Sequence, residues 1–122
     1  MNEPALLNIK GYRSAHFFDR KHYKHWGKDL QGIVSDEQYL DVARRVGKEA
    51  AHGLPGTHVE RRGNNNLIVY ASTAITRRYS SNCDGGLFMV VQDAGGYGYL
   101  VTLFAPDNGI SYFYAPDQRL LI

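Results

Sequence analysis

Apolar residues recur at helical spacing in two segments of the first half of the chain. The first segment runs from Ser14, a common helix-capping residue type, to Trp26, and Gly27 follows it as a helix-ending residue. The second segment starts at Ser35 with the Ser-Asp-Glu-Gln order of a capping box, and it ends at the glycines and proline of residues 53–56. The pattern therefore predicts two helices in this half.

The second half has a different pattern, in which short β-branched and aromatic runs are separated by turns rich in Asn, Asp and Gly. These runs occupy residues 57–62, 67–72, 87–92, 97–104 and 110–114. Helices followed by a series of strands are typical of an α+β domain. We therefore predict an α+β fold in which N-terminal helices pack on a four- or five-stranded antiparallel β-sheet. The 122 residues are expected to form a single domain, with a helical part at about 12–53 and a β-meander at about 57–116.

The last two predicted strands have a register that follows from the length of their connection. Residues 105–109 make a five-residue loop, so Phe104 should face Ile110 across a hairpin. In that register Thr102 faces Tyr112, and two hydroxyl groups interrupt an otherwise apolar row. The pair has two interpretations, an ordinary cross-strand contact or part of a functional site.

Positive charge is concentrated in one segment, although the net charge is only +2. Residues 10–28 contain six Lys or Arg residues and one acidic residue. A local basic patch can steer an anionic substrate, and it is equally compatible with a solvated helix face. Cys83 is the single cysteine, which excludes an internal disulfide. No membrane-spanning segment is expected, and the first residues lack the pattern of a signal peptide.

Two histidines share the apolar stripe of the first predicted helix, where Leu or Ile is usual. Cleavage of RNA without a metal needs a base for the 2′-hydroxyl proton and an acid for the leaving 5′-oxygen, and histidine serves as either near neutral pH. His22 and His25 are therefore candidates for these two roles, in an order that the sequence leaves open. A buried, hydrogen-bonded role in the core is the competing interpretation. The candidate phosphate-binding residues are Thr102, Tyr112, Lys21, Lys24, Lys28, Arg77 and Arg78.

A metal site is the other chemistry that a His-x-x-His spacing permits. The flanking lysines repel cations, and neither Cys83 nor a nearby carboxylate is an evident third ligand. We therefore expect neither a metal nor another cofactor. His52 and His58 lie in the connection rich in Gly and Pro, and both are expected at the surface.

Three short segments resemble motifs of one bacterial nuclease superfamily. Residues 21–30 resemble its K-H-F-x-K-H-G-x-x-F opening, with Trp26 where the motif often has Gly. Residues 35–43 resemble its S-x-E-E-Y-L-x-x-A helix, and residues 102–112 resemble its T-x-F-x-P-x-x-G…Y hairpin. The group is the barnase–EndoU–colicin–RelE-like superfamily, whose shared structure is called the BECR fold. The resemblance extends from about residue 20 to residue 114, and Arg77 and Arg78 cannot be aligned with it.

The resemblance implies a metal-independent endoribonuclease that often acts on tRNA. Cleavage would proceed by transesterification to a 2′,3′-cyclic phosphate and a 5′-hydroxyl. The matching positions implied for the active site are His22, His25, Thr102 and Tyr112. Members include C-terminal toxin domains of contact-dependent growth inhibition systems, which are delivered as part of a larger toxin, act in the target-cell cytoplasm and are neutralised by a cognate immunity protein.

Two other classes of function stay open at this point. One is a non-catalytic module, either RNA-binding or a phage structural domain, that keeps the basic helix without cutting RNA. The other is an immunity protein, which would need an acidic surface complementary to a basic toxin. The basic segment at residues 10–28 argues against the immunity protein.

Overall fold

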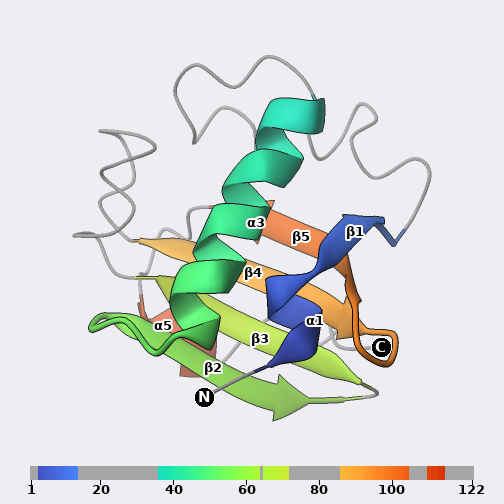
Figure 1. Cartoon of the computed structure of the whole chain (residues 1–122). Coiled ribbons are helices and arrows are strands. Elements are labelled where there is room, and N and C mark those ends of the chain that lie inside the picture. The colour runs from blue at the N-terminus through green and yellow to red at the C-terminus, as the bar shows by residue number, and fades with distance from the viewer. Residues whose placement is uncertain (1–2, 14–35, 64, 72–85, 105–109, 115–122) are drawn as a thin grey trace.

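Five strands among the described residues form one sheet with helices on both faces (Figure 1). The computed structural model describes residues 3–13, 36–63, 65–71, 86–104 and 110–114. In chain order the elements are α1 (Pro4–Leu7), β1 (Ile9–Tyr12), α3 (Asp36–Ala51), β2 (Thr57–Arg62), β3 (Asn66–Ala71), β4 (Leu87–Asp93), β5 (Gly98–Phe104) and α5 (Ile110–Tyr114). The sheet order is β1-β5-β4-β3-β2. The predicted α+β class is confirmed, and the sheet is mostly antiparallel.

Helix α3 crosses one face of the sheet and supplies much of the core (Figure 1). It is the helix predicted from the capping box, and its apolar residues Leu40, Ala43, Val46 and Ala50 recur at helical spacing and are buried. They belong to one cluster with the buried side chains that strands β3, β4 and β5 direct to this face. Helix α3 therefore covers this face of the sheet.

The opposite face of the sheet carries a second apolar cluster, which α5 partly covers. Alternate residues of the strands point to this side, among them Ile68 of β3 and Val90 of β4. Phe113 of α5 is buried against the same cluster. Strands β3, β4 and β5 are thus almost wholly buried on both faces, as expected for central strands between two layers.

Helix α1 docks against α3 and β5 at two glycines. A β carbon at Gly47 would lie 2.7 Å from the carbonyl oxygen of Leu6, and one at Gly98 would lie 2.6 Å from the carbonyl oxygen of Ala5. Real β carbons essentially never approach other atoms within 3.0 Å. Glycine at both positions lets the backbone of α1 sit directly on the helix and the sheet, which places β1 beside β5.

Arg61 of β2 ties the amino-terminal segment to the end of β4. Its Nη2 atom lies 2.9 Å from Oε2 of Glu3 and 2.9 Å from Oδ2 of Asp93. Two hydrogen bonds lower the pKa of Asp93 below its usual value. The bond from the backbone N–H of Gly95 has the larger effect, and the bond from Arg61 adds to it. The folded protein therefore favours the ionised carboxylate at this point.

The predicted carboxy-terminal hairpin is wrong. Residues 110–114 form helix α5, and Thr102 faces Val90 of β4 instead of Tyr112. The edge of β5 that the hairpin needed pairs in parallel with β1, whose neighbour Arg13 donates its N–H to the carbonyl of Leu100 at 2.9 Å. The four-residue strand β1 therefore takes part of the place assigned to the last strand, and the sheet is mixed rather than wholly antiparallel.

Candidate functional site

The structure describes two of the residues that the sequence marks as site candidates. Thr102 lies in β5, and the backbone of Tyr112 lies in α5. The others lie outside the described residues: His22, His25, Lys21, Lys24, Lys28, Arg77 and Arg78. The helix predicted at residues 14–26 lies outside them as well. Of these candidates, Thr102 alone has a described side chain, so its surroundings are the part of the predicted RNA-cleaving site that can be compared with the structure.

Thr102 is fully buried on the sheet face that points away from α3. Its relative exposure is 0%, and its Oγ1 atom has no hydrogen-bond partner within the part of the chain that the structure describes. The strand is irregular here, because Leu100 faces Val91 and Thr102 faces Val90, which makes Val101 the extra residue of a β-bulge. Bulges are common beside active sites, where they redirect a side chain. A buried hydroxyl without a hydrogen-bond partner also calls for an explanation, and a role in function is one.

Asn66 is the other buried polar residue among those described, and it points to the same face of the sheet. It lies in β3, opposite Gln92 of β4 and Arg62 of β2. Its Oδ1 atom also lacks a hydrogen-bond partner among the described residues. Two acceptor oxygens without partners thus lie on the face opposite α3, where an apolar core alone would favour hydrocarbon side chains.

Helix α5 is held at the edge of this face by an aromatic and cationic cluster. The ring of Phe113 lies 5.7 Å from that of His58 and 4.8 Å from the guanidinium of Arg62. Arg62 also donates a hydrogen bond to the carbonyl of Phe113 and pairs with Glu60 at 2.7 Å, which lowers the pKa of Glu60. His58 is therefore half-buried in internal packing rather than at the surface, whereas His52 is exposed as expected. These contacts hold α5 against strand β2.

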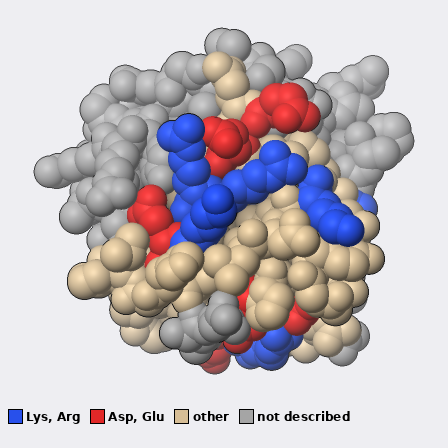
Figure 2. All heavy atoms as spheres, viewed as in Figure 1, with Lys and Arg blue, Asp and Glu red and all other residues tan. Residues whose placement is uncertain are grey.

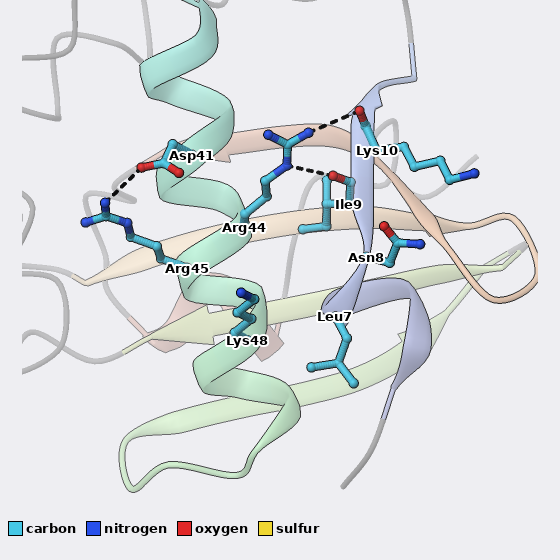
Figure 3. Close-up of a pocket in the computed structure, with 8 residues that line it drawn as sticks. All are labelled: Leu7, Asn8, Ile9, Lys10, Asp41, Arg44, Arg45 and Lys48. Carbon is cyan, nitrogen blue, oxygen red and sulfur yellow. Dashed lines mark hydrogen bonds and ion pairs between the residues drawn. The ribbon is translucent and has the colours of Figure 1, made fainter.

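A basic groove between α3 and β1 is the site that sequence reasoning missed. It has a volume of about 580 Å³ (Figure 3). Arg44 reaches across from α3, where its Nε atom donates to the carbonyl of Ile9 at 2.8 Å and its Nη2 atom donates to that of Lys10 at 3.2 Å. The lining residues are Leu7, Asn8, Ile9, Lys10, Asp41, Arg44, Arg45 and Lys48. Arg44 thus lines the groove and also links α3 to β1.

The groove is strongly cationic. Four of its lining side chains are basic and one, Asp41, is acidic, which gives a formal charge of +3. Arg45 pairs with Asp41 at 3.1 Å, and both side chains are more than half exposed. Figure 2 shows Lys and Arg side chains gathered over α3 and β1, with acidic side chains at the border. The signal in the sequence is the spacing of Arg44, Arg45 and Lys48 outside the apolar stripe of a predicted helix.

The described ranges contain neither of two other common kinds of site. In these ranges no group of three or more His, Cys, Asp or Glu side chains is placed to hold a metal ion. No helix among the same residues is long and apolar enough to cross a membrane. No protein-family model matches the chain, and no curated protein sequence matches it either.

Proposed function

We propose that this protein is a toxin domain that cleaves RNA without a metal ion. The observation that carries the proposal is Thr102, which the resemblance marks as an active-site position and whose buried hydroxyl has no partner among the described residues. The α+β fold, with helices on a mostly antiparallel sheet, is also the one that the resemblance implies. Proteins retain unfavourable buried polar groups chiefly where function requires them.

In the proposed reaction His22 and His25 act as base and acid. The neutral imidazole takes the proton of the 2′-hydroxyl, and the 2′-oxygen forms a bond to phosphorus while the bond to the 5′-oxygen breaks. The protonated imidazole gives its proton to the departing 5′-oxygen, so the protein ends with the same number of protons. The products are a 2′,3′-cyclic phosphate and a 5′-hydroxyl.

The hydroxyl of Thr102 would donate a hydrogen bond to a phosphate oxygen as negative charge builds up there. Tyr112 and the cations Lys21, Lys24 and Lys28, with Arg77 and Arg78, would hold the same phosphate. Because Thr102 is fully buried in the structure without RNA, direct contact requires that the side chains covering it move when RNA binds.

Incubation of the protein with total RNA, followed by mapping of the fragment ends, tests the proposal. Cyclic phosphate and 5′-hydroxyl ends should appear, and excess EDTA should leave the rate unchanged. His22→Gln or His25→Gln should each lower the rate about 10²–10⁴-fold without a matching fall in melting temperature. His52→Gln is the matched control, since His52 is exposed at the end of α3. Full activity of both His22→Gln and His25→Gln would contradict the assigned roles.

The same proposal includes tRNA as the substrate, delivery as part of a larger toxin and action in the target-cell cytoplasm. It also includes an immunity protein with an acidic surface, which a basic active site attracts by long-range electrostatics. Expression of the chain alone should then arrest growth. Co-expression of the immunity protein, or replacement of either helix histidine, should restore growth.

A non-catalytic RNA-binding module is the second candidate, and the groove between α3 and β1 favours it. The groove has the charge to bind RNA and contains no histidine. A module of this kind would bind RNA without producing new ends, and its binding would not depend on His22 or His25. The end-mapping experiment therefore separates the two candidates.

A further inference from the structure

We infer that the groove between α3 and β1 binds the phosphate backbone of RNA at a second place, away from Thr102. The inference rests on the proposed function in taking RNA as the ligand. The groove lies on the α3 side of the sheet, and Thr102 points to the opposite side. Because β1 is an edge strand, one RNA can contact both by passing around the β1 edge, which favours a folded RNA of the size of tRNA over a short oligonucleotide.

The cations that α3 contributes to the groove diverge from neighbouring turns of the helix. Arg44 is directed to β1, and Arg45 is directed to Asp41 (Figure 3). Lys48 follows these two arginines by four and three residues, so it lies one turn further along the helix. Within the described residues, the hydrogen bonds of Arg44 to the two carbonyls of β1 use two of its five N–H groups. Arg44 is therefore held in place and keeps donors for a ligand, which is the arrangement that suits phosphate oxygens.

Lys48 has no ion-pair partner among the described residues. No described carboxylate lies within 4.0 Å of its ammonium, whereas Arg45 shares its charge with Asp41. On the β1 side, the Nζ atom of Lys10 lies 4.1 Å from the centre of the Tyr97 ring. The Tyr97 ring is partly exposed. Aromatic rings beside basic side chains are common on RNA-binding surfaces, because bases stack on them.

The composition of the groove favours phosphate over other ligands. Its charge of +3 repels cations, and its apolar lining is limited to Leu7 and Ile9. An acidic protein surface would satisfy the charge as well, but the adjoining aromatic ring and the guanidinium that two carbonyls of β1 hold in place favour a polyphosphate strand. Figure 3 shows Arg44 directed from α3 to the backbone of β1, across the upper part of the groove.

Binding of a 2′-O-methyl RNA of tRNA size tests the inference without cleavage, because this RNA lacks the 2′-hydroxyl nucleophile. Dissociation constants are measured by fluorescence anisotropy over a range of salt concentrations. Lys48→Gln should weaken binding and reduce the slope of log K against log salt by about 0.7–0.9 if one phosphate contact is lost. Arg45→Gln should act in the same direction and also leave Asp41 unpaired. The weakening should be the same for unrelated RNA sequences.

Arg61→Gln is the charge-matched control. It also removes one positive charge, at the opposite edge strand β2, where Glu3 and Asp93 already compensate that charge. Its salt slope should equal that of the wild-type protein. Thermal melting of every variant establishes that each is folded at the assay temperature.

Several results would overturn the inference. Unchanged slopes for both Lys48→Gln and Arg45→Gln would do so, as would a wild-type protein that binds no 2′-O-methyl RNA. Inorganic phosphate that displaces this RNA more strongly than chloride of equal ionic strength would show a site for a single phosphate group instead. Reduced slopes with no cleavage of total RNA would support the groove and refute the nuclease, and cleavage with unchanged slopes would do the reverse.

Discussion

Replacement of Thr102 by valine should make the protein more stable and less active. The hydroxyl is fully buried and has no partner among the described residues, and such a group costs about 1–3 kcal/mol relative to a hydrocarbon of the same shape. Valine keeps the β-branched shape and suits the apolar row formed with Val90 and Phe104. At about 4 °C per kcal/mol for a chain of this size, the melting temperature should rise by about 4–12 °C.

Thr57→Val is the matched control, because Thr57 has the same side chain in the opposite situation. Thr57 is the first residue of strand β2, and its Oγ1 atom donates to the carbonyl of Leu54 at 2.6 Å. Loss of one satisfied hydrogen bond should lower stability by about 1 kcal/mol. The two Thr→Val changes should therefore shift the melting temperature in opposite directions.

The assay combines thermal melting, followed by circular dichroism, with the initial rate of RNA cleavage. If the hydroxyl of Thr102 meets a phosphate oxygen in the transition state, the stabilised variant should cleave about 10²-fold more slowly. A fall in the melting temperature of Thr102→Val would refute the reasoning, because it would mean that the hydroxyl is satisfied in the folded protein. A more stable variant with unchanged cleavage would remove Thr102 from the proposed site.

Two further predictions concern docking and pH. Gly47→Ala gains about 1 kcal/mol of helix propensity but forces a β carbon against the backbone of α1, an overpacking of about 1–3 kcal/mol, so its melting temperature should fall or stay level. Gly11→Ala, where a β carbon meets nothing within 4 Å, is the control, and a more stable Gly47→Ala would contradict the docking of α1. Asp93→Asn should be less stable than wild type above about pH 4, the range of an unfolded aspartate, because the Gly95 N–H and a paired arginine lower the pKa of Asp93 in the folded state. That difference should shrink as pH falls through the folded pKa, and a difference that is constant between pH 2 and pH 6 would contradict it.

Local patterns predicted most of the elements that the structure describes. Strands β2, β3, β4 and β5 lie within one residue of the predicted runs, because turn residues bracket each of them. Helix α3 starts where the capping box requires it. These features depend on neighbours in the chain, so one sequence is enough to reveal them.

The errors arise where distant segments decide the structure. Strand β1 has four residues, one of them Gly11, and its sequence does not have the pattern of a strand. It is a strand because it pairs with β5. The aromatic run at 110–114 reads as a strand, but part of the edge that it needed pairs with β1, and Phe113 is buried as part of a helix. The groove was not predicted for the same reason, because Arg44 donates to the carbonyl of Ile9, which lies 35 positions away in the chain.

The parallel pairing of β1 with β5 has a consequence for the order of folding. It joins Ile9 to Gly98, 89 positions apart, whereas the β2–β3 hairpin closes over the few residues between Arg62 and Asn66. By the logarithmic dependence of closure entropy on length, the long connection costs on the order of 3 kcal/mol more than the short one. The hairpins can form while the chain is still emerging from a ribosome, and the β1 edge should close last. Because α1 and β1 form one wall of the basic groove, that wall is completed only when β1 has paired with β5.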